Sequence, residues 1–297
     1  MRVLVTGGTG FIGRYLVAHL LNETEHEVLL LLREQYSDPR LLPPDLAKVR
    51  AQVTVVYADL RNFQLTVRAV REAEADVVIH LAAAGTTDPF LGVETAVRHN
   101  LTGTVNLLRA CFEKSTHTQQ IIVARTPGEL SAMNVYAASK AASWAFCQMF
   151  ARTQGWPVHG AMIFQAYGPG QPENAVVAAA VRAALAGQDF PMTLGLQQRD
   201  WIYADDVAAG LAALLNAPLQ TGTTLDLGTG LLTSVAAVVA QIYALVRGNG
   251  RPLPGVLPNR PGEDAAQVAD VARMRELVGW ETAVSLQEGL FKTVNGN

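Results

Sequence analysis

A glycine-rich turn near the start of the chain constrains its fold more than any other feature. A short apolar run at residues 3–5 is followed at once by the sequence Thr-Gly-Gly-Thr-Gly-Phe-Ile-Gly. Apolar residues then recur at helical spacing, at Ile12, Leu16 and Leu20. The turn therefore joins a buried strand to a helix, which is the entry to a βαβ unit.

The glycines of this turn, Gly7, Gly10 and Gly13, have the spacing of a dinucleotide-binding turn. Glycine permits the tight turn and close approach of the backbone to a pyrophosphate, and the last one lets the helix pack against the strand. The N-terminus of the helix offers free N–H groups to the phosphates. We expect Phe11 and Ile12, in the same turn, to lie against the cofactor. The alternative is a tight turn without a ligand.

Strand-like and helix-like segments alternate through the first half of the chain. Such alternation predicts parallel βαβ units, and hence an α/β fold with a Rossmann-type doubly wound parallel sheet. The predicted strands after the first are residues 28–32, 53–57, 76–81, 120–124 and 158–164, and helices are expected near residues 67–74, 102–111 and 136–153.

The second half is less regular, and a glycine- and proline-rich segment at residues 168–172 interrupts the alternation. We predict an NAD(P)-binding domain at residues 1–166, to which residues 196–228 return. Residues 167–195 and 229–297 are expected to form a smaller, discontinuous substrate-binding lobe.

Composition excludes several classes of protein. Apolar residues make up 49% of the 297 and charged residues 16%, which suits a chain with a sizeable core. The net charge of −3 argues against a dominant electrostatic grip on nucleic acid or on an anionic membrane. The two cysteines suit a reducing compartment and form no metal-binding pattern. No apolar stretch reaches membrane-spanning length and the N-terminus is not a signal peptide, so a cytoplasmic protein is expected.

The residue at the end of the second strand bears on which cofactor binds. An acidic residue about 20 positions after the glycine turn favours NAD, because it binds the ribose 2′-hydroxyl. Arg33 stands at that position, and a guanidinium suits a 2′-phosphate, which favours NADP over NAD. Two alternatives stay open. In the first, Arg33 is only a solvated charge at the end of the strand. In the second, the alignment shifts by one residue and Glu34 binds the ribose 2′-hydroxyl.

Several further motifs make the chain resemble the NAD(P)-dependent epimerase/dehydratase family, extended short-chain dehydrogenases that act on nucleotide sugars. The resemblance covers almost the whole chain. It rests on the glycine turn, Asp59-Leu60, His80-Leu81-Ala82-Ala83, Asn100, Tyr136-Ala137-Ala138-Ser139-Lys140, Tyr167-Gly168-Pro169-Gly170-Gln171, the segment RDWIYADDV from Arg199, and Arg260-Pro261-Gly262-Glu263.

The resemblance assigns cofactor contacts. It implies that Asp59 and Leu60 contact the adenine, and that Leu81, Ala82 and Ala83 line the cofactor cleft. Asn100 is expected among the cofactor-binding residues, as are Tyr136 and Lys140.

Tyr136 and Lys140 are four residues apart, which puts them on one face of a helix. The resemblance implies that Tyr136 transfers a proton to or from a sugar oxygen, and that Lys140 holds the nicotinamide ribose. An ammonium and a positive nicotinamide ring are expected to lower the pKa of Tyr136. The alternative is a structural helix that buries Tyr136 and solvates Lys140.

The third expected catalytic group is a hydroxyl at the end of the strand at residues 120–124. Thr126 stands there, and Ser131 is the alternative. Dehydratases of the family follow this hydroxyl with an Asp-Glu pair, whereas this chain has Pro127 and Gly128, with Glu129 alone. We therefore expect an NADP(H)-dependent reductase of the 4-keto group of a nucleotide-linked deoxysugar. An NAD-dependent 4-epimerase is the second hypothesis, and a non-catalytic cofactor-binding module is the third.

The resemblance also implies residues for the substrate. Arg199 and Arg260 lie in motifs whose arginines reach the substrate diphosphate, and Gln165 is expected to face the sugar. The alternative for each arginine is a surface charge. No metal ion is expected, and the family resemblance implies a homodimer.

Overall fold

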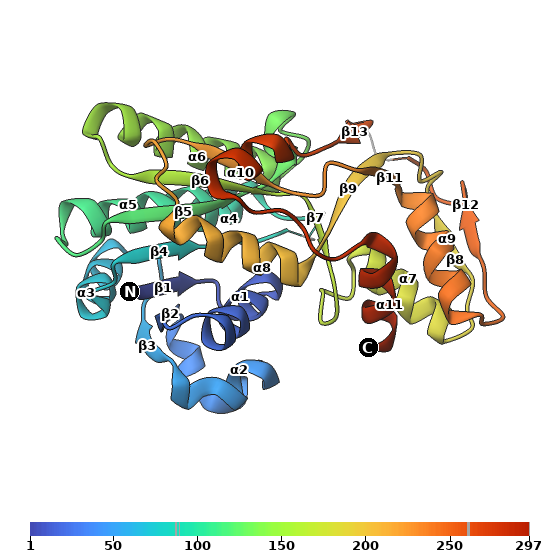
Figure 1. Cartoon of the computed structure of the whole chain (residues 1–297), viewed down its shortest axis with the longest axis horizontal. Helices are drawn as coiled ribbons and strands as arrows, with labels where there is room; N and C mark the ends of the chain where they lie inside the picture. Colours follow the sequence, from blue (N-terminus) through green and yellow to red (C-terminus); the bar gives the residue numbers. More distant parts are fainter. Residues whose placement is uncertain (87, 89, 260–261, 297) are drawn as a thin grey trace. The chain divides into compact units, whose positions relative to one another are not determined.

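The computed structural model describes residues 1–86, 88, 90–259 and 262–296 (Figure 1). Two compact units divide the chain. The first consists of residues 1–162 and 208–225, and the second of residues 163–207 and 226–297. Each unit has its own core and is described by itself below.

A seven-stranded sheet is the centre of the first unit, with the order β10-β6-β5-β4-β1-β2-β3. The strands are β1 (Arg2–Thr6), β2 (Glu27–Leu32), β3 (Thr54–Tyr57), β4 (Val77–His80), β5 (Gln120–Arg125), β6 (Val158–Ile163) and β10 (Thr224–Leu227). The pairings from β6 through β3 are all parallel. The predicted doubly wound fold is confirmed.

Helices follow the strands because the intervening segments carry apolar residues at helical spacing. They are α1 (Phe11–Glu23), α2 (Pro44–Val49), α3 (Phe63–Ala73), α4 (Val93–Ala96), α5 (Gly103–Glu113), α6 (Val135–Gln154) and α8 (Ala204–Ala213), which crosses from one unit to the other. A π-helical turn at Val97–Thr102 joins α4 to α5. Leu107, Trp144 and Cys147 belong to the core formed with the strands, so α5 and α6 pack on the sheet.

The strand order reverses between β1 and β4, because the chain first builds β1, β2 and β3 and then returns to place β4 on the other side of β1. In open α/β sheets, ligands bind at the carboxyl ends of the strands at such a switch point. The carboxyl ends of β1 and β4 are therefore the place at which to look for the site.

The second unit is built around a four-stranded sheet in which β9 (Gln198–Tyr203) pairs with β7 (Gln165–Tyr167), β11 (Leu232–Ser234) and β13 (Ala266–Gln267). Strands β8 (Phe190–Met192) and β12 (Pro252–Pro254) form a separate pair. Helices α7 (Val176–Leu185), α9 (Val235–Val246), α10 (Val271–Val278) and α11 (Leu286–Asn295) complete it. Residues 196–207, predicted to return to the large domain, contribute β9 to this smaller sheet instead.

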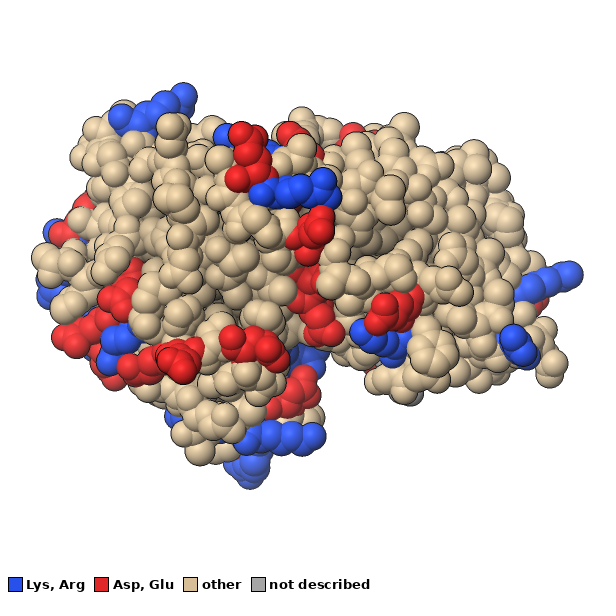
Figure 2. All heavy atoms as spheres, in the orientation of Figure 1, with Lys and Arg blue, Asp and Glu red and all other residues tan. Residues whose placement is uncertain are grey.

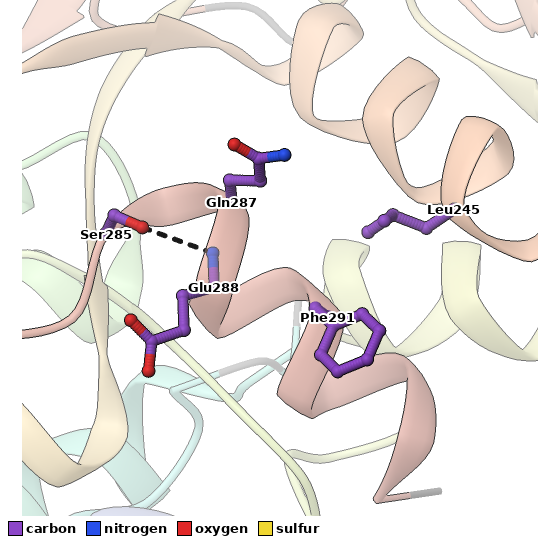
Figure 3. Close-up of a pocket in the computed structure, with 5 residues that line it drawn as sticks. All are labelled: Leu245, Ser285, Gln287, Glu288 and Phe291. Atoms are coloured by element: carbon purple, nitrogen blue, oxygen red, sulfur yellow. Dashed lines mark hydrogen bonds between the residues drawn. The ribbon is translucent and has the colours of Figure 1, made fainter.

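A shallow pocket of about 310 Å³ lies between α9 and α11 in the second unit (Figure 3). Leu245, Ser285, Gln287, Glu288 and Phe291 line it. The Ser285 hydroxyl already serves the helix, since it accepts the Glu288 N–H at 3.3 Å and caps α11. The pocket thus contains no residue for which the sequence predicts chemistry.

Charged side chains are sparse, and on the face shown in Figure 2 the two signs lie among large uncharged areas. Against this background the buried charged side chains stand out: Glu129, Lys140, Arg199, Asp200 and Asp206. Among the described residues, no helix is long and apolar enough to cross a membrane. The same part of the chain holds no group of three or more His, Cys, Asp or Glu residues that could bind a metal ion.

Candidate active site

The glycine turn lies directly against the loop that follows β4. Gly7 has a φ of +76°, and a Cβ there would stand 2.6 Å from the Ala82 nitrogen. At Gly13 a Cβ would stand 2.2 Å from the Gly7 carbonyl oxygen. Both positions therefore require glycine, because any side chain would push the turn away from β4 or from α1.

The N-terminus of α1 has the properties of a phosphate site. Its N-cap is Gly10, which has no side chain to bond the first N–H groups, and no acidic residue lies in the first turn. Phe11 and Ile12 are partly buried in that turn. The helix thus presents unpaired donors and the positive end of its dipole beside a glycine-lined turn, and these features fit a dinucleotide pyrophosphate.

The loop after β4 is fixed by backbone and side-chain bonds. Leu81 N donates to the Thr6 carbonyl at 3.1 Å, and Ala82 N donates to the Thr6 hydroxyl at 3.3 Å. Asn100, which is 1% exposed, bonds both the N–H and the carbonyl of Ala84. Leu81, Ala82 and Ala83 thereby follow the carboxyl end of β4, next to the glycine turn.

Asn100 has its side chain engaged within the protein. Besides Ala84, its amide donates to the Ser139 hydroxyl on α6 at 2.9 Å. Its own carbonyl accepts from Ser143 at 2.6 Å. Asn100 therefore joins the loop after β4 to α6, and its contact with the cofactor stays a prediction.

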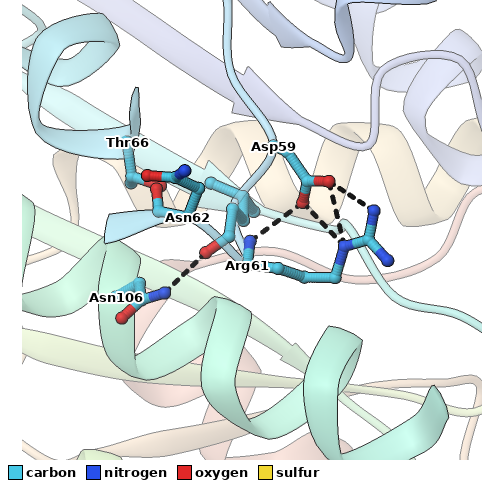
Figure 4. A network of polar contacts seen from close by, with 6 residues as sticks. Asp59, Arg61, Asn62, Thr66 and Asn106 are labelled. Carbon is cyan, nitrogen blue, oxygen red and sulfur yellow. Dashed lines mark hydrogen bonds and ion pairs between the residues drawn. The ribbon is translucent and has the colours of Figure 1, made fainter. Parts of the chain in front are cut away.

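Hydrogen bonds hold the loop after β3 (Figure 4). Arg61 donates from its backbone and its guanidinium to Asp59, and these bonds lower the pKa of Asp59 to about 2. Asn106 donates to the Leu60 carbonyl at 2.8 Å. The Asn62 side chain caps α3 by accepting from Leu65 N at 3.1 Å. Asp59 and Leu60 are thus held in place at the edge of the sheet, where the adenine contacts are predicted.

Arg33 lies next to this loop. It follows β2 directly, and Ala58 N donates to the Leu32 carbonyl at 2.9 Å, which aligns the ends of β2 and β3. Arg33 is exposed, with its guanidinium carbon 5.9 Å from the centre of the Tyr36 ring. Burial is the main cause that lowers the pKa of His99, and the positive charge of Arg61 is the next. Arg33 also lowers this pKa, whereas Asp59 raises it. Cationic side chains therefore gather at this end of the site.

The tyrosine and lysine lie one turn apart on α6, as predicted. Asn134 caps the helix by accepting from Ala137 N at 2.8 Å, which places Tyr136 in the first turn. Lys140 is only 4% exposed. Burial lowers the pKa of Lys140, while Glu129 acts to raise it.

The pKa of Tyr136 differs from the expectation. Burial raises it and Glu129 adds to this, whereas a hydrogen bond with the Thr86 hydroxyl lowers it. The protein without ligands therefore holds Tyr136 as a neutral phenol at pH 7. The expected lowering depended partly on a positive nicotinamide ring, which is a charge outside the chain.

Thr126 follows β5 directly, and its backbone N–H takes part in the cap of the short helix at Pro127–Leu130. Thr126 N donates to Glu129 Oε1 at 3.0 Å. Ser131, the alternative hydroxyl, is exposed and donates to the Gly128 carbonyl at 3.4 Å. Arg125 pairs with Glu129 at 2.9 Å, and its guanidinium lies 4.5 Å from the Trp144 ring. A charged pair thus packs against α6 at Trp144, one helical turn after Lys140.

Two of the predicted substrate residues, Arg199 and Gln165, lie in the second unit. Arg199 is buried and pairs with Glu263 at 3.0 Å, and it also donates to the Asp264 carbonyl at 2.9 Å. Gln165 is half-buried on β7, opposite Trp201 of β9. Arg260 lies outside the described residues.

Comparison with known proteins decides the family. The model of the NAD dependent epimerase/dehydratase family matches residues 3–228. The chain belongs to this family.

Relatives and solved structures match along almost their whole length. A Bacillus subtilis (strain 168) protein described as an uncharacterized UDP-glucose epimerase, YtcB, is 27% identical, over 98% of this chain and 96% of its own. The dTDP-glucose 4,6-dehydratase of Neisseria gonorrhoeae is 28% identical, over 98% of this chain and 94% of its own. The crystal structure of the Thermus thermophilus UDP-glucose 4-epimerase in complex with NAD has a TM-score of 0.84 and 27% identity, covering 100% of this chain and 98% of its own.

As a member of the epimerase/dehydratase family, the chain is an enzyme of a nicotinamide-dependent class. One residue that the sequence reasoning missed, Thr86, hydrogen-bonds Tyr136. Thr86 follows the β4 loop, and only the folded chain shows that it reaches Tyr136. The sequence singled out Glu129 only because it lacks the acidic neighbour of the dehydratase pair. Its ion pair with Arg125 had no sequence signal, because Arg125 ends strand β5 and the i,i+4 rule applies within a helix.

Proposed function

We propose that this enzyme reduces the 4-keto group of a nucleotide-linked deoxysugar with NADPH. The observation that carries the proposal is the Tyr136–Lys140 pair. A phenol that burial keeps protonated lies one helical turn from a buried lysine, in a fold whose glycine turn fits a dinucleotide. Such a phenol is a proton donor, which is what the reduction of a ketone requires.

The glycine turn, the N-terminus of α1 and the Asp59–Arg61 loop would hold the cofactor. When bound, the nicotinamide supplies the hydride that turns the carbonyl carbon into a carbinol carbon. Leu81, Ala82 and Ala83 follow β4 at the same edge of the sheet, and Asn100 bonds the backbone of that loop at Ala84. These residues would keep water from the reacting face.

The chain's own residues handle the proton. Tyr136 Oη donates it to the carbonyl oxygen as the C–O double bond becomes a single bond, which leaves a phenolate. The ammonium of Lys140, one turn away, stabilises that phenolate and contacts the nicotinamide ribose. The Thr126 hydroxyl donates to the developing alkoxide and so steadies the substrate oxygen.

A dehydratase is disfavoured by the segment after Thr126. Elimination of water needs a carboxylic acid and a carboxylate free to move protons. Pro127 and Gly128 carry no such groups, and Glu129 is engaged by Arg125 and by the Thr126 N–H. The segment after Thr126 therefore favours a reductase or an epimerase over a dehydratase.

Arg33 supports NADPH as the reductant. It is exposed at the end of β2, beside the Asp59 loop, where a 2′-phosphate on the adenosine ribose would lie. A guanidinium binds a phosphate through two parallel hydrogen bonds. For the sugar nucleotide we propose Arg199 and Arg260 at the diphosphate and Gln165 at the sugar.

A second candidate is a 4-epimerase that keeps NAD and returns the hydride to the opposite face of the sugar. The Thermus thermophilus epimerase with NAD, at 27% identity over the full chain, favours it. Both candidates use the same Tyr136–Lys140 chemistry and differ in whether the cofactor is consumed.

One assay separates the candidates. The purified enzyme is incubated with NADPH and a 4-keto-6-deoxy nucleotide sugar, and the absorbance of the reduced cofactor is followed. Stoichiometric consumption with formation of the 4-hydroxy sugar supports the reductase. Interconversion of UDP-sugars with bound NAD and no net consumption supports the epimerase. Tight cofactor binding without either reaction contradicts both.

A further inference from the structure

A buried network of polar side chains joins the strand before the glycine turn to α6. Its members come from β1, β4, the π-helical turn, α5 and α6, and each is at most 6% exposed: Thr6, His80, Asn100, Thr104, Ser139 and Ser143. Buried polar groups are stable when they are hydrogen-bonded, and a fully satisfied network holds its members in one arrangement. The contacts of each member therefore limit where the others can lie.

His80 is at the centre of this network, at the point where the strand order reverses. It ends β4 and is the register partner of Thr6, which ends β1. Its Nδ1 lies 2.7 Å from the Thr6 hydroxyl, and its Nε2 lies 2.9 Å from the Thr104 hydroxyl on α5. Burial, followed by Lys140, lowers the pKa of His80 to about 3, so the imidazole that bridges β1 and α5 is neutral at pH 7.

The partners of the imidazole decide which nitrogen carries its proton. Thr104 donates its one hydroxyl hydrogen to the Asn100 carbonyl at 2.6 Å, because a carbonyl oxygen can only accept. Thr104 must then accept from Nε2 of His80, and Nδ1 accepts from the Thr6 hydroxyl. Thr6 Oγ1 in turn accepts the Ala82 N–H at 3.3 Å. The bonds thus run in one direction, from the loop after β4 through His80 to the π-helical turn.

Asn100 continues the network to α6. Its carbonyl accepts from the Thr104 hydroxyl and also from the Ser143 hydroxyl, each at 2.6 Å. Its side-chain amide donates to the Ser139 hydroxyl at 2.9 Å, and Ser139 donates to the Tyr136 carbonyl at 2.7 Å. Asn100 lies in the π-helical turn, a distortion that is frequent at functional sites. The hydrogen bonds therefore lead from β1 to the first turn of α6, which carries Tyr136.

The glycine turn has backbone hydrogen bonds of its own. Gly10 N donates to the Gly7 carbonyl at 2.9 Å, and Leu81 N donates to the Thr6 carbonyl at 3.1 Å. Loss of the imidazole would leave these bonds in place, whereas it would break the bond to Thr104 of α5. We therefore expect a change at His80 to act on α6 more than on the turn that fits the cofactor.

We propose that His80 is a positioning residue: through Thr104 and the π-helical turn it fixes where α6 places Tyr136 relative to the glycine turn. The imidazole touches no reacting atom in this role. The inference rests on the proposed function in one respect, since the placement of Tyr136 matters for proton transfer to a sugar oxygen. A misplacement of about 1 Å can lower a rate about 100-fold, so a small movement of α6 is enough.

A histidine that only filled the core would behave differently. Its replacement would lower the free energy of unfolding but would change neither the environment of Tyr136 nor kcat of the folded enzyme. His159 on β6 offers this comparison, because it is 3% exposed and its Nδ1 has no hydrogen-bond partner among the residues that the structure describes. His159→Asn is therefore the matched control for His80→Asn.

The first test follows Tyr136 in the enzyme without ligands. In protein labelled with ¹³C at tyrosine Cζ, the seven tyrosines give few signals, and the signal that disappears in Tyr136→Phe belongs to Tyr136. We expect this signal to move in His80→Asn, because the shorter amide cannot bond both Thr6 and Thr104. It should stay in place in His159→Asn. An unmoved signal in folded His80→Asn overturns the proposal.

Thr104 provides a second pair of variants in case His80→Asn does not fold. Thr104→Val removes the hydroxyl and should move the Tyr136 signal, whereas Thr104→Ser keeps the hydroxyl and should restore it. Thr66 is also buried and donates to the Asn62 carbonyl four residues earlier, at 2.8 Å, so Thr66→Val is the matched control with an unmoved signal. A signal that stays in place in Thr104→Val, or moves equally in Thr104→Ser, contradicts the proposal.

The second test is kinetic. We expect Thr104→Val to lower kcat about 10- to 100-fold and to leave the Kd of the cofactor unchanged, with kcat recovered in Thr104→Ser. An unchanged kcat, or a loss explained by weaker cofactor binding, contradicts the role of His80. If the wild-type enzyme shows no reaction, the proposed function fails and the ligand-free signals still decide the role of His80. Unmoved signals beside a working assay overturn that role and leave the reaction standing.

Discussion

Two arginine–glutamate pairs, one in each compact unit, show how the same chemistry serves different ends. Arg125 and Glu129 are four residues apart with side chains 10% and 1% exposed, and the Arg125 guanidinium lies 4.5 Å from the Trp144 ring of α6. Arg199 and Glu263 are 64 residues apart, and Arg199 also binds the backbone carbonyl of Asp264. The first pair is local and packs against α6, whereas the second ties a distant segment to β9.

The difference teaches that burial of a charge is not by itself a sign of catalysis. Asp200, beside Arg199, is completely buried, yet it accepts from Thr229 N at 2.8 Å, Gly230 N at 2.8 Å and Ala269 N at 3.1 Å. These bonds organise the loops of the second unit. In the first unit the buried Glu129 likewise accepts from Arg125 Nε at 2.9 Å and from Thr126 N at 3.0 Å.

The largest effect should come from removing the proton donor of the first unit. Tyr136→Phe should lower kcat by about 10²–10⁴-fold, because general acid catalysis contributes that much. Cofactor binding, followed by fluorescence, should stay unchanged. Tyr243→Phe is the matched control in the second unit, where the hydroxyl donates to the Gln188 carbonyl at 2.7 Å. It should cost about 1 kcal/mol of stability and leave kcat intact. Equal kcat in the two variants refutes the role of Tyr136.

Breaking the pair of the second unit should act on stability and on substrate binding. Arg199→Met leaves Glu263 without its cation and should lower the free energy of unfolding by about 3 kcal/mol in urea titrations. If Arg199 also reaches the diphosphate, KM for the sugar nucleotide should rise more than kcat falls.

Arg275→Met is the control for that variant, because Arg275 and Glu281 form an exposed pair with side chains 66% and 67% exposed. Exposed pairs contribute about 0–1 kcal/mol. Equal destabilisation by the two variants would show that the Arg199 pair does not tie the second unit together.

Lowering the pH should decrease the stability of the first unit, which contains all six histidines of the chain. His80 bonds Thr6 at 2.7 Å and Thr104 at 2.9 Å, and burial, followed by Lys140, lowers its pKa from 6.5 to about 3. As the pH falls, His80 takes up a proton in the unfolded chain at a higher pH than in the folded chain. The free energy of unfolding therefore decreases as the pH falls below 6.5.

The loss from His80 should be about 2 kcal/mol at pH 5. Urea titrations at pH 7 and pH 5 measure it, and His80→Gln should reduce the difference between the two. His117→Gln, at an exposed position, should not. A difference that His80→Gln leaves unchanged would exclude His80 as its source.

The smallest effect concerns the cofactor. Arg33→Ser should weaken NADPH binding about tenfold and leave NADH binding unchanged, since only NADPH carries the 2′-phosphate. Arg98→Ser, also an exposed arginine of the first unit, is the control. Equal weakening of both cofactors by Arg33→Ser would remove the case for NADPH.

Much of the first unit could be predicted from the sequence, because its signals are local. The glycine turn, the alternation of strands and helices, and the spacing of Tyr136 and Lys140 each lie within a short stretch of chain. The family and the doubly wound fold, which these signals predicted, are confirmed.

The remaining features depend on contacts between distant residues. Thr86 reaches Tyr136 across 50 positions of sequence, and Arg125 reaches Thr224 across 99. The assignment of residues 196–207 to the smaller sheet depends on the pairing of β9 with β7, β11 and β13. The roles of Thr126, Gln165 and the two arginines, and the homodimer, stay predictions.

The central claim is that the chain carries hydride chemistry at C4 of a nucleotide-linked sugar, with Tyr136 as proton donor. The most direct measurement uses NADPH deuterated at C4 of the nicotinamide, a 4-keto-6-deoxy nucleotide sugar, and mass spectrometry with NMR of the product. The account predicts one deuterium, at C4 of the sugar, and its loss in Tyr136→Phe. A bound cofactor that transfers no deuterium to any sugar carbon would contradict it.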